Sequence, residues 1–233
     1  MNGRIDGGMM RYLLPALLAL VGFGSIATAQ GHDWSTTVSK APNGSYVIGN
    51  PRAKVKLVEY ISYTCPHCGH FLSESRAVLR GQMVRSGSTS VELRNAIRDK
   101  LDLTAALLSR CTGPKGFFAT TDAIFAVQED WVTRGGRFES VNGARIAAYP
   151  QPAQLRAMAD GSGLSDIMRG RGMNDAAIEA CLNDPAELAV VVKNADGAWA
   201  KIKGTPAFEL NGKTIETTEW AVLEKSLRAA GAK

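Results

Sequence analysis

The feature that most constrains this fold is an apolar segment that leads through a pair of cysteines into a helical pattern. Residues 55–62 are rich in β-branched and aromatic side chains, which predicts a strand buried on both faces. From Pro66 to Met83, apolar residues recur at steps of three and four, which predicts a helix. Residues 91–97 predict a second strand. This order implies a parallel pair of strands joined by a right-handed crossover.

The rest of the chain predicts helices first and strands afterwards. Residues 99–184 have helical periodicity in four stretches, at 103–111, 114–131, 153–160 and 174–183. Asp184 and Pro185 are typical of a helix start, and the apolar stripe expected behind them is Leu188, Val191, Val192, Ala195, Trp199 and Ile202. Asn211 and Gly212 lie between two short apolar runs and predict a hairpin. The last helix is expected to bury Trp220, Leu223 and Leu227.

The expected fold class is therefore α/β, with a mixed central sheet flanked by helices and interrupted by an all-helical insertion. We expect the sheet domain at 45–98 and 185–233 and the insertion at 99–184. Residues 30–44 are polar and contain glycine and proline, so we expect a flexible leader there.

The N-terminal segment has the pattern of a secretory signal peptide at 1–29. Arg11 precedes an apolar stretch at 13–26, and an A-x-A cleavage pattern follows at 27–29. The alternative is an uncleaved anchor helix, although the apolar stretch is shorter than the roughly 20 residues of a bilayer span. Export would place the protein in the periplasm, where disulfides persist. The net charge of +5 is spread along the chain, so we expect no nucleic-acid partner.

The two cysteines of the Cys65-Pro66-His67-Cys68 run predict a redox centre. Cys65 is expected at the helix N-terminus, where free N–H groups and the helix dipole favour a thiolate. Pro66 suits the first helical position, and His67 can add a donor or a positive charge beside the sulfur. Cys68, one turn further on, is expected to be the buried resolving thiol. A stabilised Cys65 thiolate would make the disulfide oxidising.

Other interpretations of this motif remain open. A zinc site needs four ligands within reach, and a periplasmic metal carrier could use Cys65, Cys68 and His70. Covalent haem attachment needs a histidine directly after the second cysteine, where this chain has Gly69. A structural disulfide without redox activity is a further alternative. We expect no bound metal and no cofactor.

The sequence resembles the DsbA family of thioredoxin-fold proteins over residues 45–230. The resemblance is carried by the C-P-H-C run after an apolar strand, the helical insertion, and Gly204-Thr205-Pro206 before a hairpin. It implies a thioredoxin fold and thiol:disulfide oxidoreductase activity. It also implies that Pro206 is a cis-proline beside the cysteines and that the Thr205 backbone pairs with a substrate peptide.

The resemblance implies further roles and partners. Glu59 matches a buried acid beneath the disulfide that relays the proton of Cys68, with an edge-facing glutamate on a strand as the alternative. His67 is carried over as the thiolate stabiliser. The implied partners are unfolded or partly folded exported proteins with cysteine thiols, and a DsbB-like membrane quinone reductase that restores the disulfide. We expect a monomer.

Two departures from the family pattern bear on the direction of electron flow. Thr205 stands where valine is common in the oxidase, and Thr64 stands where an aromatic residue is often found. Both leave the direction of net electron flow open, and Thr205 favours the alternative of a disulfide isomerase or reductase of the same fold. Against an isomerase, the leader at 30–44 is too short for the dimerisation domain of DsbC-type enzymes.

The remaining cysteines, Cys111 and Cys181, both fall in the helical insertion. A structural disulfide between them is the simplest interpretation for an exported protein, and some DsbA-like proteins have such an extra pair. A regulatory redox pair and two buried free thiols are the alternatives.

Overall fold

Within residues 32–233, a six-stranded mixed sheet forms the centre of the fold, in the order β1-β2-β4-β3-β5-β6. The strands are β1 (Val38–Lys40), β2 (Tyr46–Gly49), β3 (Val55–Ile61), β4 (Thr89–Asn95), β5 (Ala207–Leu210) and β6 (Lys213–Ile215). β3 and β4 run parallel, and the other neighbours are antiparallel. The predicted α/β class with a mixed sheet is therefore confirmed.

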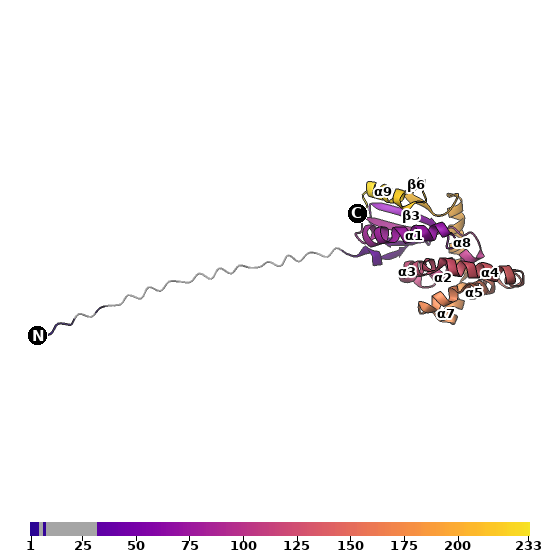
Figure 1. The fold of residues 1–233 in the computed structure, drawn as a ribbon, viewed down its shortest axis with the longest axis horizontal. Helices are drawn as coiled ribbons and strands as arrows, with labels where there is room; N and C mark the ends of the chain where they lie inside the picture. The colour runs from indigo at the N-terminus through magenta and orange to yellow at the C-terminus, as the bar shows by residue number, and fades with distance from the viewer. Residues whose placement is uncertain (5–6, 8–31) are drawn as a thin grey trace. The chain divides into compact units, whose positions relative to one another are not determined.

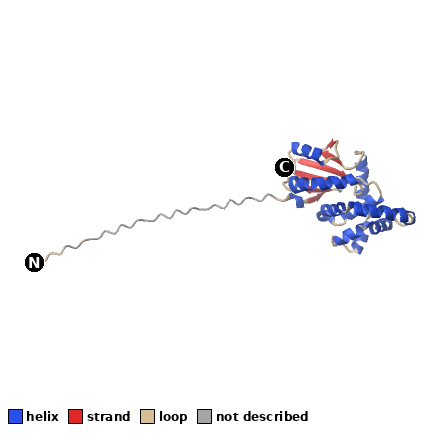
Figure 2. Ribbon diagram, in the orientation of Figure 1, coloured by secondary structure: helices blue, strands red, loops and turns tan. Residues whose placement is uncertain are grey.

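The computed structural model describes residues 1–4, 7 and 32–233, and the chain divides into two units, Met1–Gln30 and Gly31–Lys233. Figure 2 shows the strands of the second unit between its helices. Apart from residues 1–4 and 7, the signal peptide expected at 1–29 lies outside the described residues. Among the helices of the described part, none combines the length and the apolar character that a membrane crossing requires.

The helix α1 (Pro66–Val78) connects β3 to β4 and continues into a π-helical segment, η2 (Leu79–Val84). Gly87, with φ of +79°, makes the turn into β4. The crossover agrees with the sequence, although β4 begins and ends two residues earlier than expected.

The two faces of the sheet bury different helices. Alternate residues of β3, such as Leu57 and Ile61, point into the main core with α1, α3 (Gly113–Ala126) and α9 (Trp220–Ala229). The Phe71 ring of α1 packs against Phe208 of β5 at 4.6 Å between centroids. On the other face, Tyr60 packs with residues of β4's end and of α8 (Pro185–Trp199).

The insertion between β4 and α8 is helical throughout, as expected. It consists of α2 (Lys100–Arg110), α3 (Gly113–Ala126), α4 (Gln128–Ile146), α5 (Gln151–Ser162), α6 (Leu164–Gly170) and α7 (Asp175–Leu182). Figure 1 shows most of these helices gathered in one block beside the strands. The single helix expected at 114–131 is broken at Val127, whose φ of −126° and ψ of 32° are not helical. The sequence also gave no sign of α6, which follows Gly163 at φ +84°.

The helix α8 begins as predicted, because the Asp184 carboxylate accepts hydrogen bonds from the N–H groups of Ala186 and Glu187. Its expected apolar stripe is only partly buried. Val192 is 41% exposed and Trp199 is 37% exposed, because the helix turns its inner face along Val191, Ala195 and Ala198 instead.

The C-terminal hairpin and helix agree with the sequence. Asn211 and Gly212 have φ of +50° and +81°, as the tight hairpin turn requires. In α9, Trp220, Leu223 and Leu227 are buried.

The leader expected to be flexible at 30–44 is partly ordered. Trp34–Thr36 forms a short 3-10 helix, and β1 pairs with β2 at the edge of the sheet. The reason is local packing, because Val38 contacts the core and the Trp34 ring lies against Gly87. A three-residue edge strand with one apolar residue gives too little periodicity to be recognised.

Candidate active site

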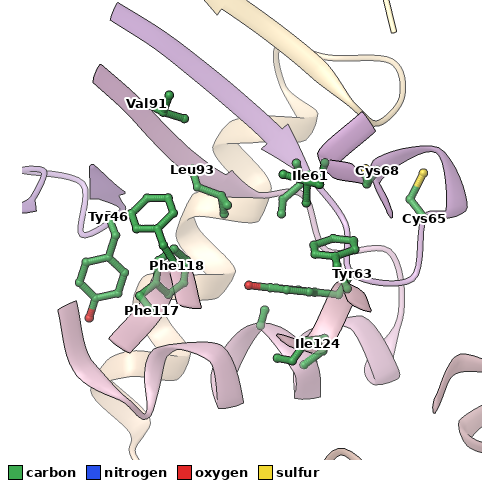
Figure 3. Packing of buried hydrophobic residues seen from close by; sticks show 14 of the residues in the cluster. Tyr46, Ile61, Tyr63, Cys65, Cys68, Val91, Leu93, Phe117, Phe118 and Ile124 are labelled. Carbon is green, nitrogen blue, oxygen red and sulfur yellow. The ribbon is translucent and has the colours of Figure 1, made fainter. Parts of the chain in front are cut away.

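The two cysteines of the motif lie at the junction of β3 and α1. Cys65 is the N-cap residue of α1, with extended backbone angles, and Pro66 occupies the first turn. The Cys65 carbonyl accepts the Cys68 N–H at 3.1 Å, which starts the helix. Both thiols are free in this structure, with residue exposures of 4% for Cys65 and 0% for Cys68. Figure 3 shows the two cysteines at one end of the buried hydrophobic cluster.

The segment before β5 meets the first cysteine. The peptide bond between Thr205 and Pro206 is cis. The Cys65 thiol donates a hydrogen bond to the Thr205 carbonyl oxygen at 3.2 Å. Pro206 and Thr205 therefore lie beside the redox-motif cysteine, although they are 140 residues away in sequence.

The surroundings of the two sulfurs differ strongly. A hydrogen bond from the Cys68 thiol lowers the pKa of Cys65 to about 5, against the effect of burial and with help from the Thr205 side chain and two backbone N–H groups. Burial, together with the neighbouring Cys65, raises the pKa of Cys68. Cys65 is therefore a thiolate at neutral pH, and Cys68 is a protonated thiol. The reactive sulfur of an exchange reaction is the thiolate, so this geometry assigns the attack to Cys65.

The histidine of the motif acts differently from the sequence expectation. The His67 side chain is exposed, and it is the backbone N–H of His67 that contributes to the lowered pKa of Cys65. His70 is also exposed and pairs with Glu74 at 3.3 Å. Over the described residues, no three His, Cys, Asp or Glu side chains are grouped as metal ligands.

Glu59 lies in β3 and is fully buried. In the sheet register it stands between Leu93 and Phe208, so its carboxylate faces an apolar environment. Both carboxyl oxygens lack a hydrogen-bond partner among the described residues. Burial raises the pKa of Glu59 to about 7, an effect that Arg80 opposes and Asp122 reinforces. The alternative of an edge-facing glutamate is wrong, because β3 lies between β4 and β5 and Glu59 is buried. The residue is a buried acid that can exchange a proton near neutral pH.

Sequence reasoning missed three side chains that hold the loop before Cys65. Asp102, at the start of α2, accepts hydrogen bonds from this loop, and burial raises its pKa to about 7 although Ser62, Tyr63 and Arg98 oppose the rise by hydrogen bonding. Asp99 caps the same helix. Gln128, at the start of α4, donates to the Tyr63 and Cys65 carbonyl oxygens at 2.7 and 2.9 Å. Only the Asp-Lys-Leu-Asp run at 99–102, typical of a helix start, could have drawn attention to two of them.

The second cysteine pair is separate from this site. Cys111 at the end of α2 and Cys181 in α7 form a disulfide, with their Cα atoms 5.7 Å apart and a sequence separation of 70. The bond ties the first helix of the insertion to its last.

A strand–helix–strand unit, a dithiol at the helix start and a facing cis-proline define a thioredoxin-fold protein with a redox-type site. A family model described as thioredoxin matches residues 41–229, so the chain belongs to the thioredoxin family. The predicted thioredoxin fold is confirmed.

Two solved structures are similar to this chain over most of its length. The crystal structure of a protein-disulfide isomerase from Novosphingobium aromaticivorans is 34% identical, with a TM-score of 0.73 over 78% of this chain and 95% of that one. Alpha-DsbA1 of Wolbachia pipientis shares the fold at 22% identity and a TM-score of 0.63, over 82% of this chain and 94% of that one. The expected resemblance to DsbA-like proteins is confirmed.

A curated relative from Rickettsia conorii bears the name "Putative protein-disulfide oxidoreductase". It is 25% identical over 185 residues, which cover 78% of this chain. The matched region is 58% of the relative, so this chain aligns with little more than half of that protein's length.

Proposed function

We propose that this protein is a thiol–disulfide oxidoreductase that introduces disulfides into folding exported proteins through Cys65 and Cys68. The observation that carries the proposal is that the pKa values of the two thiols at this helix start are shifted in opposite directions. The Cys65 pKa is lowered to about 5, whereas burial raises that of Cys68. A dithiol whose outer sulfur is a stable thiolate holds its disulfide weakly and passes it on.

The reaction begins with the disulfide between Cys65 and Cys68. A substrate thiolate attacks the Cys65 sulfur, a mixed disulfide forms, and the Cys68 sulfur leaves with the electron pair. A second substrate thiolate then attacks the substrate sulfur of the mixed disulfide, and Cys65 leaves as a thiolate. The substrate has lost two electrons and gained a disulfide, and the protein holds both electrons as the reduced pair.

Cys68 must take up a proton after it leaves, because burial disfavours its thiolate. Glu59 is the buried acid available for this step, since its pKa of about 7 leaves it partly protonated at neutral pH. The Thr205 carbonyl, which accepts from the Cys65 thiol, lies where a substrate peptide would pair with the backbone.

The location and partners belong to the same proposal. The signal pattern at 1–29 supports export to the periplasm, where reduced chains with cysteine thiols emerge. Turnover requires an oxidant that takes two electrons from the reduced pair, and we propose a DsbB-like membrane quinone reductase.

A second candidate, disulfide isomerisation or reduction by the same site, is favoured by two observations. Thr205 precedes the cis-proline, and the Novosphingobium aromaticivorans neighbour at 34% identity is described as a protein-disulfide isomerase.

The reduction potential of the Cys65–Cys68 pair separates oxidation of substrates from their reduction by this site. The mature protein is equilibrated in glutathione buffers, and the reduced fraction is counted by alkylation and mass spectrometry. We expect a value near DsbA's roughly −120 mV, whereas a value near thioredoxin's roughly −270 mV would make the protein a reductase. The variant with Cys111→Ser and Cys181→Ser, measured alongside, shows that the counted thiols belong to the motif.

A further inference from the structure

The loop that carries Cys65 is held by the helical insertion. Asp102, fully buried in the first turn of α2, points both carboxylate oxygens at this loop. One oxygen accepts the Tyr63 N–H at 2.7 Å. The other accepts the Ser62 hydroxyl at 2.6 Å and the Arg98 N–H at 3.0 Å. Three donors thus converge on one carboxylate.

Asp99 extends the same arrangement by one residue. One of its carboxylate oxygens accepts the Asp102 N–H at 2.7 Å and caps α2. Its other oxygen accepts the Thr64 hydroxyl at 2.9 Å. The start of α2 therefore bonds to Ser62, Tyr63 and Thr64 in succession, and the next residue is Cys65.

The other side of the loop is held by α3 and α4. The Tyr63 hydroxyl lies 2.8 Å from that of Thr121, and its ring stacks on Phe125 with centroids 5.0 Å apart. Gln128 donates to the carbonyls of Tyr63 and Cys65. With two of its carbonyls and its aromatic ring held by these helices, the loop depends on Asp102 for the Tyr63 N–H and the Ser62 hydroxyl.

Asp102 takes no direct part in the exchange reaction. Its carboxylate bonds to the loop and to Arg98 and makes no hydrogen bond to either sulfur. Burying a carboxylate in the core costs free energy unless its hydrogen bonds offset that cost. Tyr63 and Arg98 offer backbone N–H groups, which can only donate, so an acceptor-only carboxylate fits them.

We propose that Asp102 is a positioning residue for the Cys65 thiolate, fixing through the loop where the sulfur lies relative to the start of α1 and to Thr205. This inference rests on the proposed function for its relevance to exchange. The groups that stabilise the thiolate, Cys68, Thr205 and the first N–H groups of α1, lie on other segments. A loop freed from Asp102 lets the sulfur move away from them, which disfavours the thiolate and the reduced pair.

The test is Asp102→Asn in the otherwise unchanged protein. The amide keeps one oxygen for Tyr63 and can donate to the Ser62 hydroxyl, but its NH₂ faces the Arg98 N–H, so one hydrogen bond is lost. We expect the reduced pair to become less favoured against glutathione by about tenfold at about pH 8, where the Asp102 carboxyl is ionised, as for one lost hydrogen bond to a charged group, and the pH midpoint of Cys65 alkylation by iodoacetamide to rise.

The matched control is Asp130→Asn, which makes the same change in the first turn of α4 at an exposed site. We expect wild-type values for it. A folded Asp102→Asn protein with an unchanged alkylation midpoint and glutathione equilibrium would overturn the proposal.

A second variant keeps the test decisive if Asp102→Asn does not fold. Ser62→Ala removes one of the three donors and adds no bulk, so it should shift both values in the same direction by a smaller amount. If both values equal the wild type's in that variant, the inference is wrong. Wild-type protein that fails to oxidise a dithiol peptide would count against the proposed function alone, because the alkylation midpoint is measured without any substrate.

Discussion

Glu59→Gln tests directly whether the buried acid of β3 titrates near neutral pH. The Glu59 pKa rises from 4.5 to about 7 on folding, so the folded protein binds the proton more tightly than the unfolded chain. Between these values, stability falls as pH rises, because ionisation is opposed only in the folded state. The contribution of protonated Glu59 is complete below pH 4.5 and is lost as pH passes through 7. Glutamine stays neutral and has no such dependence.

The size of this pH-dependent difference in stability follows from the shift in the Glu59 pKa. At about 1.4 kcal/mol per pKa unit, ionised Glu59 costs the folded state about 3 kcal/mol. The Glu59→Gln protein should therefore match the wild type near pH 4.5 and exceed its free energy of unfolding by about 3 kcal/mol at pH 8.5. The opposing Arg80 and the reinforcing Asp122 are already included in this pKa.

The assay is urea unfolding followed by circular dichroism from pH 4.5 to 8.5, with the Cys65–Cys68 pair reduced in both proteins. The difference between variants cancels the titration of Asp102 and of the cysteines. Glu216→Gln, an exposed site, is the control and should give a flat difference. A difference for Glu59→Gln that does not change with pH would refute the reasoning, since Glu59 would then ionise as freely in the folded protein as in the unfolded chain.

Three further predictions concern the rest of the site. Alkylation of the reduced protein should modify Cys65 with a pH midpoint of about 5 and leave Cys68 unmodified until the protein is unfolded. Peptide mass mapping would show which cysteine has reacted, and a midpoint near 8 would contradict the assignment of Cys65 as the thiolate. Replacing Cys111 and Cys181 by serine should lower the free energy of unfolding by about 4 kcal/mol in urea while exchange through the motif continues, and an unchanged stability would contradict the loop-entropy argument. Gln128→Leu leaves two loop carbonyls without their donor and should cost about 2 kcal/mol in the same unfolding experiment, whereas no loss would mean that water replaces the amide.

The parts of the fold that the sequence predicted well are those specified by neighbouring residues. A proline after Cys65 and an Asn211-Gly212 pair restrict their own backbone, so the start of α1 and the hairpin could be located without the structure. The same local rules failed at Val127, where the apolar pattern continues across a break between two helices. Periodicity shows which residues are buried, and the buried residues keep a helical spacing across the break from Ile124 of α3 to Trp131 of α4.

The candidate site likewise has residues that local sequence predicted and residues that it could not predict. Cys65 and Cys68 are adjacent and could be assigned from their spacing, but their supports come from distant segments. Asp102 lies 39 residues from Tyr63, and Gln128 lies 63 residues from Cys65. Nothing in a single sequence marks an aspartate in a helix's first turn as buried, because that position is also the commonest place for an exposed one.

Glu59 and Asp102 are both buried carboxyl groups, but we assign them different roles. Burial raises the pKa of both Glu59 and Asp102 to about 7. Glu59 has no hydrogen-bond partner among the described residues, so no hydrogen bond is broken when it ionises, and it suits proton transfer. Asp102 holds three donors, so any change in its protonation disturbs the loop before Cys65. An unpartnered acid can move a proton, and a fully partnered one can hold a structure; hydrogen bonding, more than pKa, distinguishes their roles.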